Sequence, residues 1–135
     1  MAERMSNVIS CWKAWADVNT RTKGLSLARK LASAMGTEHF GLRAEKYHKG
    51  GYVTFFNIEH PQDAWNDFVV DVIGLGQKVA SDWILTGNVQ ADPSGWSTRC
   101  RISGITAVSW DTHVDWTARG TESKGGDQRQ NRVGV

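Results

Sequence analysis

The chain has 135 residues, a length that suits one globular domain and leaves little room for a second. Hydrophobic residues make up 40% and charged residues 22% of the sequence, which excludes an intrinsically disordered chain. The net charge is +2. Residues 1–58 contain nine basic and four acidic residues, whereas residues 59–98 contain one basic and six acidic residues. The sequence therefore lacks the sustained basic excess that nucleic-acid binders show.

In chain order, the first predicted element is an amphipathic helix at the N-terminus, interrupted by Asn19 and Thr20. A second helix is predicted between Leu25 and Met35, and Gly36 stands where a left-handed residue would end it. Both predictions follow from apolar residues that recur at helical spacing. In the first helix these are Met5, Val8, Ile9, Trp12, Trp15 and Ala16; in the second they are Leu25, Ala28, Leu31, Ala32 and Met35.

A change of period then predicts a β-hairpin. Apolar residues alternate over 40–44 and again over 52–58, and Gly50 and Gly51 between them permit a tight turn. Pro61 suits the first position of a third helix, whose apolar stripe runs from Trp65 to Val79. Gly74 and Gly76 weaken this helix, and either allow close packing or end it early.

The last third of the sequence predicts three strands, over 83–89, 96–102 and 105–114, with turns at 92–95 and 103–104. The whole pattern predicts an α+β fold, with one antiparallel sheet of about five strands, helices on one face, and the order α-α-β-β-α-β-β-β. Residues 1–116 are expected to form a single globular domain, and 117–135 a flexible C-terminal tail. The tail is rich in glycine and polar residues and has no large apolar residue before Val133.

The sequence contains no recognisable motif for catalysis, metal binding or a cofactor. The four histidines (His39, His48, His60 and His113) have no zinc-type spacing, and no local signature marks a serine or cysteine nucleophile. Cys11 and Cys100 are expected to be reduced and buried. Without a signal peptide or a membrane-length apolar run, we expect a cytoplasmic protein with no membrane partner.

One helix carries an ordered stripe of carboxylates. Asp63, Asp67 and Asp71 recur every four residues, with Glu59 upstream, so they share one face of the predicted helix. Like charges at this spacing cost a helix a few tenths of a kcal/mol. A solvated surface explains Asp63 well, whereas a docking surface for a basic partner explains the repetition better.

The amino-acid sequence of several segments resembles that of the small immunity proteins of contact-dependent inhibition and other polymorphic toxin systems. These segments are Asp63-Ala64-Trp65 through Leu75-Gly76, Trp83-Ile84-Leu85-Thr86-Gly87, Ile102-Ser103-Gly104-Ile105 and Val108-Ser109-Trp110. The resemblance spans about residues 60–112 and transfers no contact residue by position. It implies a cytosolic protein without catalysis that binds its cognate toxin, often a nuclease, through an acidic surface.

We therefore expect a protein that blocks a basic toxin domain, with no enzymatic activity and no nucleic-acid partner. The predicted contact residues are Glu59, Asp63, Asp67, Asp71 and Asp82, with Trp83 or Trp96 as apolar anchor. One alternative is a phage or mobile-element inhibitor of a nucleic-acid-processing complex, with the same acidic face. The other is a small enzyme or ligand-binding domain whose pocket holds some of Tyr47, Tyr52, His60 and His113.

Overall fold

A computed structural model describes residues 7–115, and the predicted 117–135 tail lies outside them. The described chain contains two helices, a six-stranded antiparallel sheet and a two-stranded one. The α+β class is therefore confirmed, with one more strand in the main sheet than the five predicted. The elements are β1 (Asn7–Ala16), α1 (Arg21–Met35), β2 (Phe40–Lys46), β3 (Tyr52–His60), α2 (Trp65–Val79), β4 (Ala80–Ser81), β5 (Ile84–Thr86), β6 (Ser94–Ser97), β7 (Arg99–Cys100) and β8 (Ile105–Asp115).

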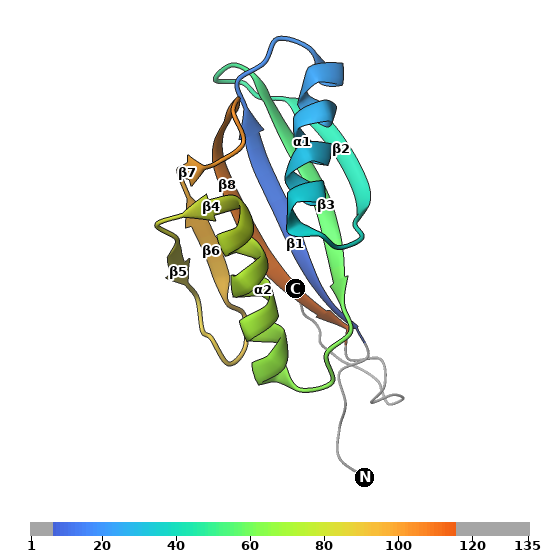
Figure 1. Cartoon of the computed structure of the whole chain (residues 1–135), viewed down its shortest axis with the longest axis vertical. Coiled ribbons are helices and arrows are strands. Elements are labelled where there is room, and N and C mark those ends of the chain that lie inside the picture. Colours follow the sequence, from blue (N-terminus) through green and yellow to red (C-terminus); the bar gives the residue numbers. More distant parts are fainter. Residues whose placement is uncertain (1–6, 116–135) are drawn as a thin grey trace.

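The main sheet has the order β2-β3-β1-β8-β6-β5. Since β3 is antiparallel to both β1 and β2, and β1 is antiparallel to β8, the two helices make crossovers between strands of the same direction. The result is an interleaved pair of β-α-β units, the split β-α-β arrangement, with β4 to β7 inserted before the last strand. Both helices lie on one face of the sheet, α1 in front of β2 and β3, and α2 in front of β8 and β6 (Figure 1).

The N-terminal segment is the strand β1, so the prediction of a helix there is wrong. Every second residue of this segment is buried under the helices, in the order Val8, Ser10, Trp12, Ala14 and Ala16. The period of two was hidden because the opposite face of β1 also carries apolar side chains. Ile9, Cys11 and Trp15 are half-buried there, and together the two faces imitate helical spacing.

The second predicted helix and the hairpin are confirmed. Helix α1 begins after Thr20, whose side chain accepts a hydrogen bond from the backbone N–H of Lys23, and it ends at Gly36 with φ 73°. The hairpin turn uses Gly50 and Gly51, both with positive φ. A Cβ on Gly51 would lie 2.4 Å from the carbonyl oxygen of Ala16, so this turn requires a glycine on steric grounds as well.

Helix α2 is confirmed, but it begins at Trp65 and not at Pro61 as predicted. It continues through both glycines to Val79. Of the two roles considered for the glycines, Gly76 has the packing role. A Cβ at this position would lie 3.1 Å from the ring of Trp83.

The C-terminal third is more divided than predicted. Only residues 84–86 of the first predicted strand form β5, and the second predicted strand is split into β6, which pairs with β5 and β8, and β7, which pairs with β4. The long last strand is confirmed as β8. It and β1 flank each other at the centre of the sheet with Trp12 opposite Trp110, both fully buried.

Candidate functional site

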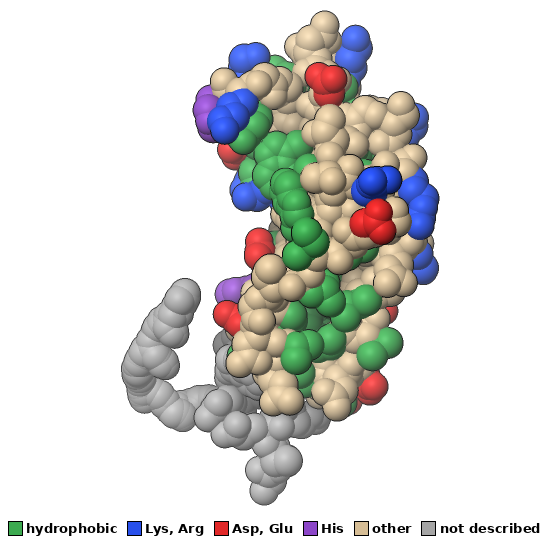
Figure 2. All heavy atoms as spheres, turned by 90° about the vertical axis from the view of Figure 1, so that its left-hand side faces the viewer, with side chains coloured by type: hydrophobic (Ala, Val, Ile, Leu, Met, Phe, Trp, Pro, Cys, Tyr) green, Lys and Arg blue, Asp and Glu red, His purple; other side chains and the backbone are tan. Residues whose placement is uncertain are grey.

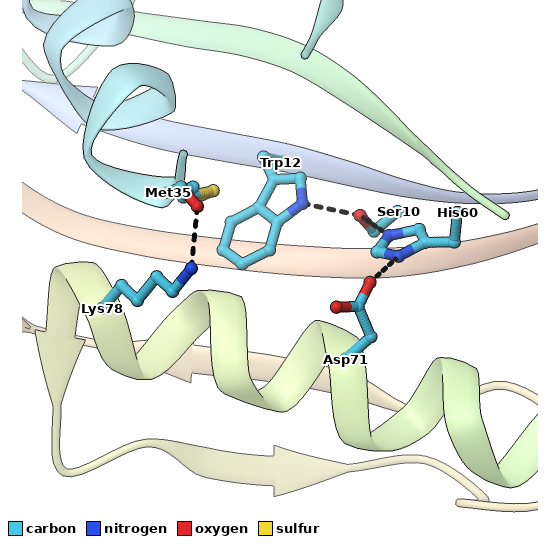
Figure 3. Close-up of polar contacts among 6 residues, drawn as sticks. All are labelled: Ser10, Trp12, Met35, His60, Asp71 and Lys78. Carbon is cyan, nitrogen blue, oxygen red and sulfur yellow. Dashed lines mark hydrogen bonds and ion pairs between the residues drawn. The ribbon is translucent and has the colours of Figure 1, made fainter. Parts of the chain in front are cut away.

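A chain of hydrogen bonds runs from the core to the surface of α2 (Figure 3). The indole Nε1 of Trp12 lies 2.7 Å from Ser10 Oγ, which lies 2.7 Å from Nε2 of His60. The other ring nitrogen of His60, Nδ1, lies 2.8 Å from Oδ2 of Asp71. Sheet pairing explains the convergence, because Val8 is opposite His60 in the β1–β3 register and Ser10 is on the same face of β1.

The chemistry of the donors fixes the direction of this chain. An indole N–H only donates and a carboxylate only accepts, so Trp12 donates to Ser10 and His60 Nδ1–H donates to Asp71. Ser10 then donates its O–H to Nε2 of a neutral imidazole. Burial lowers the pKa of His60, and the hydrogen bond and charge of Asp71 act in the opposite direction. When His60 is neutral, every polar side-chain group in this series of hydrogen bonds has a partner.

Serine, histidine and aspartate in this order also form the catalytic group of many hydrolases. Here the side chains are buried beneath α2: Ser10 is 0% exposed and His60 is 4% exposed. The Ser10 oxygen also accepts the Trp12 N–H, and no substrate atom reaches it in this arrangement. We therefore interpret the chain as a structural connection between β1, β3 and α2.

The acidic residues of the predicted stripe occupy different environments. Asp67 is exposed in the first turn of α2, and Asp63 is exposed in the loop before it. Asp71 lies on the same helix, but its side chain is 36% exposed and turned to His60. Glu59 is exposed on the opposite face of β3 from His60. Lys78, further along α2, donates to the backbone oxygen of Met35 at 3.1 Å and thereby ties α2 to the end of α1 (Figure 3).

The end of β3 and the loop after α1 enclose a depression with a volume of about 510 Å³. Three carboxylates line it: Glu38 from the loop after α1, and Glu59 and Asp63 from the end of β3 and the loop that follows. Gln62 also lines it, and within residues 7–115 its side-chain oxygen is buried without a hydrogen-bond donor. The remaining lining residues are Val8, Thr37, His39, Phe40, His60 and Pro61, so the described part of the chain supplies no lysine or arginine to the lining.

The other predicted contact residues lie elsewhere. Asp82 has a positive φ of 54° and lies 3.5 Å from Arg99 at the β4–β7 ribbon. Trp83 packs edge-on against Trp12 and donates to the backbone oxygens of Gly76 and Ala80, so it is part of the core. Trp96 is 40% exposed, on the face of the sheet away from the helices. The structure thus brings Glu59 and Asp63 together and leaves Asp82, Trp83 and Trp96 outside the depression.

The four residues considered for a ligand pocket are also spread out. Tyr52 and His60 begin and end β3, a separation of about 27 Å at the usual strand rise. Tyr47 is at the hairpin, and His113 is exposed on the helix-free face. Over the described range, no three His, Cys, Asp or Glu residues are grouped as metal ligands. Cys11 and Cys100 are unpaired and half-buried, and burial is the main cause that raises the pKa of both thiols.

Sequence reasoning missed Glu38, Gln62 and the Ser10–His60 contact. Period-two burial in the N-terminal segment was the signal for Ser10, because a strand there turns Ser10 and Trp12 to one face. Glu38 carries no such signal, since only the folded chain brings the loop after α1 beside the end of β3.

Comparison with known proteins adds no further candidates: no family model, no curated protein and no solved structure matches the chain. Neither helix of residues 7–115 has the length and apolar character needed to cross a bilayer.

Proposed function

We propose that this chain is an immunity-type protein that binds and neutralises a basic toxin domain, such as a nuclease, and that the acidic depression makes the contact. The observation that carries the proposal is the convergence of Glu38, Glu59 and Asp63 on one concave surface, to which residues 7–115 contribute no lysine or arginine. Such a surface attracts a cationic partner, accelerates the encounter and disfavours acidic partners.

Two further features support a partner that donates hydrogen bonds. The buried side-chain oxygen of Gln62 has no donor within residues 7–115, and an arginine or lysine of a partner would supply one. Phe40, at the same depression, is 48% exposed and offers an apolar anchor beside the carboxylates. An exposed aromatic residue ringed by charge is the usual composition of a binding hot spot.

The proposed contact set differs from the one expected from sequence. Glu59 and Asp63 are kept, and Glu38 is added because it lines the same depression. Asp67 is exposed in the first turn of α2, outside this lining. Asp71 is given a supporting role, since its carboxylate already accepts a hydrogen bond from His60. Asp82, Trp83 and Trp96 lie outside the depression and are not needed for this contact.

The test uses the product of the gene adjacent to that of this chain, which the proposal expects to be a toxin domain. Co-expression of the wild-type chain is expected to restore growth of a bacterial host that produces this domain, and the purified pair is expected to bind more weakly as salt rises. The double substitution Glu38→Lys with Asp63→Lys, two residues of the lining, should lower the association rate by about tenfold or more and abolish the growth rescue. Both side chains are exposed, so thermal stability should stay near that of the wild type.

The matched control is Asp17→Lys with Asp111→Lys, which makes the same change of charge at two exposed positions outside the depression. It should leave rescue and affinity unchanged. The acidic-depression version of the proposal is wrong if the control impairs binding as much as the test variant does. The immunity function itself is wrong if the wild-type chain neither binds nor neutralises the adjacent gene product.

A further inference from the structure

The face of the sheet opposite the helices carries a row of cationic and aromatic side chains. The strand register places Arg43 opposite Phe55, Phe55 opposite Lys13, and Lys13 opposite Ser109. Ser109 in turn is opposite Trp96, and Trp96 is opposite Ile84. This cross-strand row therefore spans all six strands, about 24 Å at the usual strand spacing, and contains two cations and no acid.

The side chains of the row contact one another. The Arg43 guanidinium lies 3.9 Å from the centre of the Phe55 ring, and Lys13 Nζ lies between the Phe55 ring at 5.6 Å and the Trp15 ring at 5.7 Å. Trp15 packs edge-on against Trp96 at 5.3 Å, joining the next position of β1 to the row. The cations are thus held against ring faces on an open sheet, with Glu45 as an ion-pair partner of Arg43.

A groove of about 400 Å³ beside the hairpin turn adjoins the row at Trp96. Its lining combines Trp15, Trp96 and Tyr47 with Lys49 and Asp17. Figure 2, which views the β5–β6 edge, shows a hydrophobic strip with basic and histidine side chains gathered above it. The groove therefore offers flat apolar walls together with a lysine, and its volume falls within the usual range for a small-ligand site.

We propose that the cross-strand row and this groove bind single-stranded nucleic acid. Bases stack on Trp96 and Trp15, and Lys13 and Lys49 contact the phosphates. Interleaved rings and cations on an open surface recognise any base through its π-face and the backbone through its charge. Protein interfaces also use such rings, but lysines placed between and beside them favour a ligand that supplies planar rings and regular negative charge together.

This inference is independent of the proposed toxin contact, because the row and the acidic depression have no residue in common. It also goes against the expectation from net charge. The balance of the whole sequence hides the row, since its residues come from six separate strands. Of the nearby acidic residues, Glu59 is on the same face of β3 as Phe55, whereas Asp67 and Asp71 are on α2. Only strand pairing brings Lys13, Arg43 and Trp96 onto one surface.

The test measures binding of the full chain to fluorescent oligo-U and oligo-dT of about 12 nucleotides, by anisotropy and by quenching of tryptophan emission. We expect a Kd of roughly 1–100 µM at low salt. The logarithm of the association constant should fall with the logarithm of salt concentration with a slope of about −1.4, for two phosphate contacts on a single strand. Preference for oligo-U would identify RNA as the ligand, and equal binding would identify single strands in general.

Three variants and two controls assign the binding to the row. Lys13→Gln should reduce the magnitude of the salt slope by about 0.7, and Lys30→Gln, an exposed lysine on α1, should not change it. Trp96→Ala should weaken binding roughly 5- to 150-fold, as expected for the loss of one base stack, and Trp96→Phe should restore most of it. Phe40→Ala, an exposed aromatic outside the row, should bind like the wild type.

The proposal is overturned by the absence of binding up to roughly 100 µM protein at low salt. It is equally overturned if Lys30→Gln or Phe40→Ala weakens binding as much as its counterpart in the row. Thermal unfolding of each variant shows whether the fold is intact. Should Trp96→Ala unfold, Lys13→Gln alone decides, because it changes only a half-buried surface lysine.

Discussion

Replacement of Ser10 by alanine should be among the most damaging single changes to this fold. The Ser10 hydroxyl is buried and satisfies two groups at once, since it accepts from Trp12 Nε1 and donates to His60 Nε2. Ser10→Ala removes one oxygen and fits sterically, so packing changes little. It leaves an indole N–H and an imidazole nitrogen in the core without a partner.

The magnitude follows from those two orphaned groups. An unsatisfied buried donor or acceptor costs about 1–3 kcal/mol, so Ser10→Ala should lower the free energy of unfolding by about 2–6 kcal/mol. Native domains have a total stability of only about 5–15 kcal/mol, so this loss is large. Thr54→Val is the matched control on the same sheet face. Its buried hydroxyl donates to a single acceptor, the Ala14 carbonyl oxygen, and the loss should be about 1 kcal/mol.

Urea unfolding followed by tryptophan fluorescence gives both free energies, and an unchanged m-value would show that the unfolded state is the same. A double-mutant cycle sharpens the assignment. With Ser10 already alanine, Trp12→Phe removes one orphan, so it should cost less than Trp12→Phe in the wild type by about 1–2 kcal/mol. The reasoning is refuted if Ser10→Ala costs no more than Thr54→Val, or if the cycle shows no coupling.

Three further outcomes follow from the described contacts. Burial depresses the pKa of His60 below its usual 6.5, so the unfolded protein takes up this proton before the folded protein does as the pH falls. The contribution of His60 to the free energy of unfolding is therefore complete above pH 6.5 and declines below it. Thermal melts from pH 7.5 to 5 should therefore show a steeper loss for the wild type than for His60→Gln, by at most about 1.4 kcal/mol per pH unit. Gly74→Ala should stabilise α2 by about 0.5–1 kcal/mol, because nothing lies within 4 Å of the new methyl group. Gly76→Ala should destabilise the fold by about 1–3 kcal/mol, because the new methyl group would press against the ring of Trp83. Chemical denaturation of the two variants tests the contrast. Thr20→Ala removes the side-chain cap of α1 and should cost about 1 kcal/mol by the same assay, and no loss would mean that the cap is dispensable.

The elements that were predicted well are those whose pattern is decided locally. Helix α1 has one buried face and a glycine with positive φ at its end, and the hairpin has paired glycines at its turn. Strand β1 was misread because a central strand receives apolar neighbours on both faces. Its identity depends on β3 and β8, which lie far away in the sequence.

The candidate site was accessible from sequence only in part. The spacing of Asp63, Asp67 and Asp71 predicted one helix face, but α2 begins at Trp65, so Asp63 precedes it. Spacing on a helix also cannot show which carboxylate turns inward. Asp71 does so because His60, 11 residues earlier, ends β3 beneath α2. Glu38 joins the depression through the chain reversal between α1 and β2, and the aromatic–basic face depends on cross-strand register. Tertiary contacts of this kind leave no local trace in one sequence.

The buried hydrogen-bond chain and the acidic depression meet at His60, which belongs to both. A protonated imidazole in the wall would add positive charge beside Glu59 and Asp63 and weaken the attraction for a basic partner. The hydrogen bonds between Trp12, Ser10 and His60 disfavour the protonated imidazole. Ser10 can donate to Nε2 only while Nε2 is unprotonated, so protonation would take away the acceptor of the buried Ser10 O–H. The core thereby favours a neutral His60, and the imidazole adds no positive charge to the wall of the depression. A polar chain that costs stability when broken thus also maintains the electrostatic character of the surface above it.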